Sequence, residues 1–165
     1  MSAATTQFRQ GVEAADVNAM LDALTADAFL RSPVAAGLRF EGRDVLAQLF
    51  AATTVLYEDV EVTHDFGDAA SWLLGFRARI GRQAFQETLL MGLAEDGRID
   101  ELTAAIRPIA GVATVAGAVG QQLARRHGRV RALALEALTA PLVQMARSGD
   151  AIGPKLLRPL GGRDR

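Results

Sequence analysis

Hydrophobic residues recur with two different periods along this chain, and the change of period predicts how it folds. In the first third, apolar positions are spaced three or four residues apart, as in helices with one buried face. This spacing predicts helices over Thr5–Ala15 and Arg43–Thr54, and a short strand over Ala28–Ser32 that Pro33 ends. A further short helix is expected after Asp16, its cap, with one face formed by Val17, Met20, Leu21 and Leu24.

The period then changes to two, which is typical of strands with one buried face. Four strands are expected, over Val60–Phe66, Trp72–Ile80, Gln83–Leu93 and Ile99–Arg107. In the first of them, His64 is in phase with the apolar residues Val60, Val62 and Phe66. Glu95–Arg98 is predicted to be a hairpin turn in which Gly97 adopts a positive φ.

Helical spacing returns after Pro108. It predicts helices over Ala110–Arg126 and Arg129–Arg147, and Pro141 either kinks the second or starts a new one. The last segment, Ser148–Arg165, is rich in Gly, Pro and basic residues, and we expect a flexible tail there.

Helices first and strands afterwards indicate an α+β fold. A curved antiparallel sheet with one apolar face would pack on the N-terminal helices and enclose a cone. We expect residues 1–109 to form this domain, 110–147 a helical extension and 148–165 a flexible basic tail.

Charge divides the chain at nearly the same place. Residues 1–106 have a net charge of −8, and residues 107–165 have a net charge of +7. The basic segment has no Tyr, Trp or Phe to stack on bases, so nucleic-acid binding is not expected. It can pack on the acidic domain, on a second copy of the chain or on an anionic partner. A biased genome composition would also produce this distribution.

Composition excludes several kinds of chemistry. The chain has no Cys, which excludes disulfides, thiolate metal sites and a cysteine nucleophile. The two histidines, His64 and His127, are too far apart to form a metal-binding motif, and there is no glycine-rich phosphate loop. No metal or cofactor is therefore expected. We see no signal peptide and no membrane span, so a cytoplasmic location is expected.

The order and spacing of several short motifs resemble those of the nuclear transport factor 2-like (NTF2-like) superfamily, in particular its SnoaL-like branch. The resemblance covers about residues 4–109. The motifs that match are Asp16–Met20, Leu24–Ala28, Phe40–Asp44, Phe76–Arg79, Glu95–Ile99, Glu101–Thr103 and Ile106–Pro108.

This resemblance implies a conical α+β barrel, the NTF2-like or cystatin-like fold, with a pocket between the sheet and the helices. It also implies frequent formation of a homodimer through the outer face of the sheet. It does not imply one activity, because the superfamily contains ketosteroid isomerase, polyketide cyclases, dehydratases, epoxide hydrolases and non-catalytic binding domains.

The acid–base residues of the isomerase-like members are missing. Those members need a Tyr on the first helix, an Asp before the proline of the first strand, and a protonated acid on a later strand. The corresponding residues here are Phe8, Ser32 and Leu89. None of them can donate or accept a proton in the required way, so this specific chemistry is not expected.

The other enzymatic patterns are incomplete as well. Polyketide cyclase-like members use an Asp near the end of the final strand, where this chain has Ala105–Arg107. Epoxide hydrolase-like members need two Asp bridged by an Arg. Arg77 and Arg79 are present, but they alternate away from the apolar face, and no inward pair of Asp is visible.

Three residues remain as candidates for catalysis. Glu87 shares a strand face with Phe85 and Leu89, so its carboxyl group either lies in the pocket as a general acid or base, or lies at the mouth, solvated or paired with an Arg. His64 is either a structural residue or a proton shuttle. Tyr57 can donate to a ligand carbonyl or lie at the rim.

The sequence thus leads to two main hypotheses. The first is a domain that binds an apolar small molecule. The second is a divergent isomerase, cyclase or hydrolase with Glu87 as the acid or base; a weaker third is a protein-interaction subunit that uses the basic segment. In either of the first two, we expect the pocket to be lined by Met20, Leu24, Phe50, Trp72, Leu74, Phe76, Phe85, Leu89, Met91, Leu102, Ala104 and Ile106.

Overall fold

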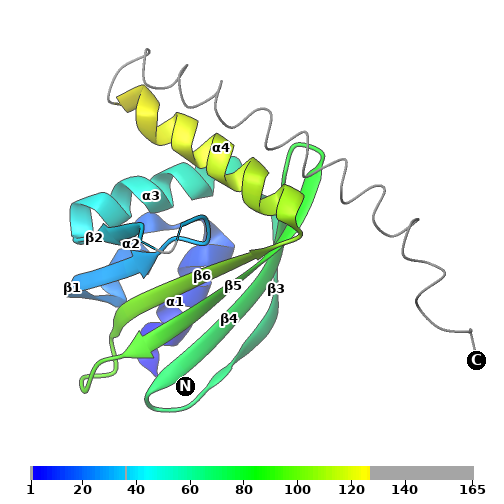
Figure 1. Cartoon of the computed structure of the whole chain (residues 1–165). Coiled ribbons are helices and arrows are strands. Elements are labelled where there is room, and N and C mark those ends of the chain that lie inside the picture. The colour runs from blue at the N-terminus through cyan, green and yellow to red at the C-terminus, as the bar shows by residue number, and fades with distance from the viewer. Residues whose placement is uncertain (1, 36, 127–165) are drawn as a thin grey trace, which may run out of the picture.

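The computed structural model describes residues 2–35 and 37–126 (Figure 1). The sequence predictions that fall on 127–165, including the second C-terminal helix, His127 and the tail, lie outside the described residues. The elements follow in the order α1 (Ala3–Ala14), α2 (Val17–Asp22), β1 (Leu24–Arg31), β2 (Arg39–Glu41), α3 (Arg43–Leu56), β3 (Glu58–Gly67), β4 (Ser71–Ile80), β5 (Gln83–Leu93), β6 (Ile99–Arg107) and α4 (Ile109–Arg126).

The first two helices begin where a side chain caps them. The Ser2 hydroxyl accepts a hydrogen bond from the Thr5 amide at 3.1 Å, so α1 begins two residues before the predicted start. Asp16 caps α2 as predicted, because its carboxylate accepts from the amides of Asn18 and Ala19 at 2.9 and 3.1 Å. The placement of Leu24 on this helix is wrong. Leu24 begins β1, where it pairs with Ile99 of β6.

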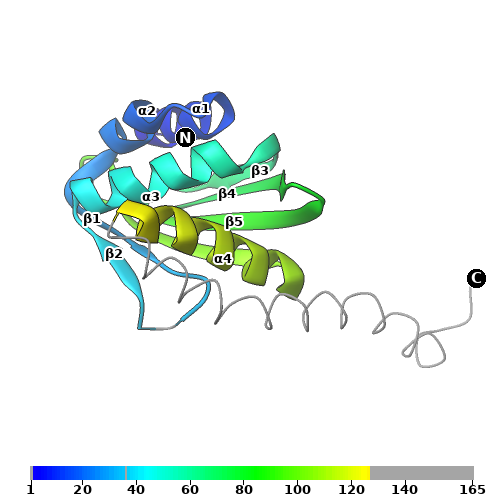
Figure 2. The same cartoon turned by 90° about the horizontal axis from the view of Figure 1, so that it is seen from above.

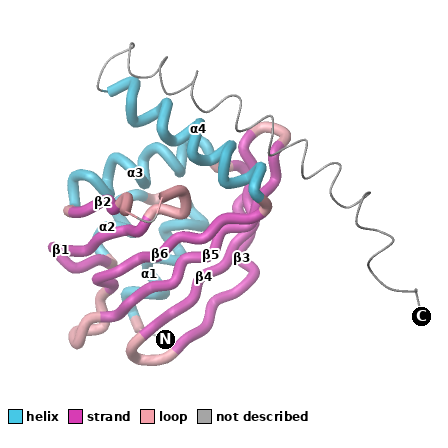
Figure 3. The backbone as a smooth tube through the Cα atoms, viewed as in Figure 1, coloured by secondary structure: helices cyan, strands magenta, loops and turns pink. Residues whose placement is uncertain are grey.

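The α+β fold class is confirmed, and the six strands form one curved sheet in the order β2-β1-β6-β5-β4-β3 (Figures 1 and 3). One pair departs from the expected antiparallel arrangement, because β1 and β6 run parallel and the sheet is therefore mixed. This pairing brings the first and last strands of the chain together and places β1 between the edge strand β2 and β6.

The helices lie along one face of the sheet. In the view from above, α3 lies between α1 with α2 on one side and α4 on the other (Figure 2). The core lies between this layer and the concave face of the sheet. Its most completely buried large side chains are Phe8, Leu46, Leu74, Met91, Ile99 and Leu102.

A bulge in β3 reverses the expected alternation in the second half of that strand. Val62 pairs with Phe76, but the register shifts before His64, which pairs with Gly75. The two residues that follow, Asp65 and Phe66, are shifted with it. His64 therefore lies exposed on the outer face of the sheet, not on the inner face as predicted.

Helix α4 packs directly on the rest of the described structure. It packs against α3, β5 and β6, and its apolar side, which includes Val115 and Val119, is buried. Gly111 permits this close packing, because a Cβ atom there would lie 2.7 Å from the Phe85 Cβ. Among the helices of the described ranges, none is both long and apolar enough to cross a bilayer.

Candidate functional site

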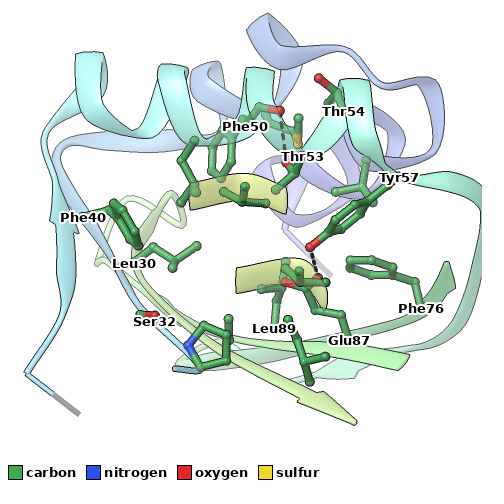
Figure 4. Close-up of a pocket in the computed structure, with 18 of the residues that line it drawn as sticks. Leu30, Ser32, Phe40, Phe50, Thr53, Thr54, Tyr57, Phe76, Glu87 and Leu89 are labelled. Carbon is green, nitrogen blue, oxygen red and sulfur yellow. Dashed lines mark hydrogen bonds between the residues drawn. The ribbon is translucent and has the colours of Figure 1, made fainter. Parts of the chain in front are cut away.

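A cavity of about 520 Å³ lies between the concave face of the sheet and the helices (Figure 4). Its wall is formed by residues of all six strands on one side and of α1–α4 on the other, with the loop between β1 and β2 at the edge. Most of the side chains that line it are apolar. Its titratable groups, within the part of the chain described, are Glu13, Tyr57, Asp59 and Glu87.

Cross-strand pairing explains which sheet residues reach the cavity. Two neighbouring rows cross the sheet at its centre: Leu74, Leu89 and Ala104 form one, and Phe76, Glu87 and Ile106 form the other. All of these except Leu74 line the cavity. Of the twelve residues expected to line the pocket, the structure places these six at the wall: Met20, Phe50, Phe76, Leu89, Ala104 and Ile106.

The other six residues expected at the wall lie in the packed core instead: Leu24, Trp72, Leu74, Phe85, Met91 and Leu102. The five of these residues that belong to β4, β5 and β6 do face inward as predicted. They miss the cavity because they lie too far along their strands. Trp72, Met91 and Leu102 form a row one step beyond the cavity. Phe85 lies one step beyond at the other end, covered by Gly111 of α4 and by the Tyr57 ring.

Glu87 and Tyr57 meet at the cavity wall, although thirty positions separate them. Tyr57 follows the last turn of α3, and its hydroxyl donates a hydrogen bond to Glu87 Oε2 at 2.8 Å (Figure 4). The Tyr57 ring packs edge-on against Phe85, with the ring centroids 4.9 Å apart. Glu87 retains only 8% of its exposure, which excludes the alternative of a solvated position at the mouth.

Burial changes the proton affinity of both groups. Loss of solvation raises the pKa of Glu87 from 4.5 to about 7, and the hydrogen bond from Tyr57 lowers this pKa only in part. Burial also raises the pKa of Tyr57 well above 10, and the nearby Glu87 carboxylate raises it further. Near neutral pH, Tyr57 is therefore a hydrogen-bond donor, whereas Glu87 can both hold and release a proton.

The positions of the missing isomerase residues all lie on the cavity wall. Phe8, Ser32 and Leu89 each line it. Phe8 packs edge-on against Phe50, and the Ser32 hydroxyl accepts a hydrogen bond from the amide of Val34. At the places where isomerase-like members hold their acid–base groups, the cavity therefore presents two apolar side chains and one hydroxyl, with no carboxyl or phenol group.

The sequence pattern did not single out two groups of residues at the wall. One is Val34 and Leu38 of the β1–β2 loop, and the other is Val115, Val119 and Leu123 of α4. Packing of the C-terminal segment on the acidic domain is among the expected alternatives, but the three- and four-residue spacing on α4 predicts an apolar face without saying which of its residues reach a cavity.

The described residues include no group of three or more His, Asp or Glu side chains that could hold a metal ion. His64 is not part of the site, because the bulge in β3 turns it to the other side of the sheet. Among the described residues, the titratable groups that meet at the cavity wall are therefore Tyr57 and Glu87, which a hydrogen bond joins.

Comparison with known proteins gives the fold. No protein-family model matches the sequence, and no curated protein matches it. Among solved structures, an uncharacterised bacterial protein with a cystatin-like fold from Silicibacter pomeroyi is similar, with a TM-score of 0.68 and 21% identity over 83% of this chain and 94% of that one.

Two solved structures with enzyme names are also similar. A steroid delta-isomerase from Pseudomonas aeruginosa has a TM-score of 0.63 and 23% identity, over 77% of this chain and 93% of that one. The epoxide hydrolase/cyclase-like enzyme SalBIII has a TM-score of 0.53 and 19% identity, over 63% of this chain and 88% of that one. Other similar structures are named NTF2-like proteins of unknown function. The chain therefore has the fold of the NTF2-like superfamily, as its sequence motifs predict.

Proposed function

We propose that this protein binds an apolar small molecule in the cavity between the sheet and the helices. The observation that carries the proposal is the cavity itself: about 520 Å³ of space with a mostly apolar wall and a single buried polar pair, Tyr57 and Glu87. Ligand sites in proteins combine these features, since an apolar wall supplies affinity and a few polar groups fix orientation.

Filling the cavity tests this proposal. Ala104 lines the wall, whereas its neighbour Ala105 is exposed on the opposite face of the sheet. We expect Ala104→Trp to weaken binding of the uncharged fluorophore N-phenylnaphthylamine by about tenfold or more, because the new ring occupies the space. Ala105→Trp should leave binding unchanged. Fluorescence titration measures both, with circular dichroism to verify folding.

Equal binding by the two variants, or no binding by the wild-type protein, would contradict the proposal. Native mass spectrometry of the purified protein, followed by denaturing extraction, gives a second measurement that needs no chosen probe. An apolar molecule retained by the wild type and the Ala105→Trp variant, but not by the Ala104→Trp variant, is the expected result.

A second candidate function is acid–base catalysis on the bound molecule by Glu87, as in a divergent isomerase, cyclase or hydrolase of the SnoaL-like branch. The observation that favours it is the buried contact of Tyr57 with Glu87, whose pKa of about 7 suits proton transfer at neutral pH. A compound extracted from the protein would be converted by the wild type but only bound by the Glu87→Gln variant.

We also propose a homodimer through the outer face of the sheet. On that face Phe66 pairs with Leu73, and Leu73 pairs with Leu90 across three adjacent strands. We call these three residues the outer apolar row. Phe66 and Leu90 are 57% and 49% exposed, and exposed apolar groups that adjoin one another favour association.

A cytoplasmic location stays a prediction.

A further inference from the structure

We propose that the ligand carries one protonated amine on its apolar body and that this amine pairs with the Glu87 carboxylate. This inference rests on the proposed binding function and adds the charge of the ligand. It is carried by three features of the cavity: the sign of the charged groups on its wall, the hydrogen bonds of Glu87 and the aromatic rings beside that carboxyl group.

The ionisable groups on the wall are all acids. Glu13, Asp59 and Glu87 line the cavity, and none of its described lining residues is Arg, Lys or His. Glu13 and Asp59 have partners, since Arg9 Nη1 lies 3.7 Å from Glu13 Oε2 and Arg79 Nε lies 2.5 Å from Asp59 Oδ2. Neither arginine lines the cavity. An anionic ligand would therefore meet acids and no cation.

One carboxyl oxygen of Glu87 has no hydrogen-bond donor among the described residues. Its Oε2 accepts from Tyr57, and no described group donates to its Oε1. Its neighbours across the sheet are Phe76 and Ile106, both apolar. From the helix layer, α3 contributes Tyr57, and the described wall residues of α4 are uncharged. A buried carboxylate without a cation is costly, and an ammonium group from the ligand would offset part of that cost.

Aromatic rings beside Glu87 suit a cation in the same place. Tyr57 and Phe76 both line the cavity, with ring centroids 6.3 Å apart, and both lie close to the carboxyl group in the view of the site (Figure 4). The face of such a ring attracts a cation, more strongly when the cation is shielded from water. A neutral ligand with a carbonyl group is the competing occupant, and it would instead need protonated Glu87.

A matched series of three ligands tests the inference. Naphthylmethylamine, naphthylmethanol and naphthoic acid share one apolar body and differ in charge. In competition against N-phenylnaphthylamine, we expect the amine to bind about tenfold more tightly than the alcohol, and the acid to bind most weakly. In the Glu87→Gln variant, which keeps the hydrogen bond to Tyr57, the amine should lose about tenfold and the alcohol less than about threefold.

The pH dependence of the wild-type protein gives an independent measurement that does not rely on a variant. Because the amine stays protonated while Glu87 ionises at about pH 7, affinity for the amine should rise by about tenfold in total as the pH rises through about 7, and then level off. Affinity for the alcohol should stay nearly constant.

The outcomes separate the two proposals. If the fluorophore binds but the amine is no tighter than the alcohol, or if amine affinity does not rise with pH, the inference is overturned and the binding function stands. If neither the fluorophore nor any of the three compounds binds, both proposals fall.

Discussion

At the scale of single residues, the carboxyl group of Glu87 has an environment unlike that of the other acids with shifted pKa values. Hydrogen bonds from backbone amides lower the pKa of Asp68, and Arg98 and Arg31 lower the pKa values of Asp96 and Glu101. Glu87 has neither an arginine nor a backbone amide as partner in the described part of the chain; burial outweighs the hydrogen bond from Tyr57, and its pKa rises. Ionisation of Glu87 therefore destabilises the folded chain, whereas ionisation of the acids with lowered pKa values stabilises it.

This difference predicts a pH effect on stability. Since the pKa of Glu87 is about 7 in the folded chain and 4.5 in its ordinary state, the folded form retains a proton that the unfolded form releases. The stabilisation is complete below about pH 4.5 and is lost as the pH rises through about 7. Between about pH 4 and pH 8, we expect the wild type to lose roughly 3 kcal/mol relative to Glu87→Gln.

Urea denaturation of both proteins across this pH range measures the effect. The difference between the two curves isolates Glu87, because the acids with lowered pKa values are common to both. Curves that run parallel would show that Glu87 is not held in its protonated form by the fold.

At the scale of elements, α4 depends on a close approach to the sheet. Gly111 lies in its first turn, and the Cβ of an alanine there would meet Phe85 Cβ at 2.7 Å and Ile106 Cγ2 at 3.5 Å. Because both neighbours belong to strands of the sheet, the helix would have to move outward. This helix also forms part of the cavity wall, so its position bears on binding.

We therefore expect Gly111→Ala to lower the free energy of unfolding by about 1–2 kcal/mol. Overpacking costs about 1–3 kcal/mol, and the better helix propensity of alanine offsets up to about 1 kcal/mol of it. Gly37→Ala is the control, since nothing lies within 4 Å of a Cβ atom there. Thermal unfolding followed by circular dichroism compares them, and equal stability of the two variants would contradict the close approach.

At the scale of the whole molecule, the sheet has two faces with different roles. The concave face encloses the cavity and the core, whereas the outer face presents the outer apolar row to solvent. A second copy of the chain is the partner that the family resemblance implies for this face. The helix layer lies on the concave side, so a dimer through the outer face leaves the cavity unobstructed (Figure 2).

The dimer proposal predicts that Leu90→Lys produces a monomer, because a charge at the β5 end of the outer apolar row opposes burial of that row. Val55 is a suitable control. It is 71% exposed on α3, away from the sheet, so Val55→Lys should leave the oligomeric state unchanged. Sedimentation velocity measures both. A wild-type protein that sediments as a monomer at all concentrations would rule out this interface.

The sequence alone was sufficient for the elements whose signals are local. The alternation in β5 and β6 and the turn at Gly97 predicted both strands with the bounds that the structure has. The inward direction of Glu87 followed from the same alternation. These features depend on neighbours along the chain, because a side chain in a strand points opposite to the next one and a turn residue must adopt its own φ.

Tertiary structure alone decided the rest. Leu24 belongs to a strand because Ile99, distant in the sequence, pairs with it. His64 faces outward because a bulge shifts the register of β3. Tyr57 reaches Glu87 because the end of α3 lies over β5, and a buried carboxyl group with one donor acquires a raised pKa. Alternation gives the face of a side chain, but its depth along the strand and the element that covers it depend on contacts between distant parts of the chain, which local periodicity does not encode.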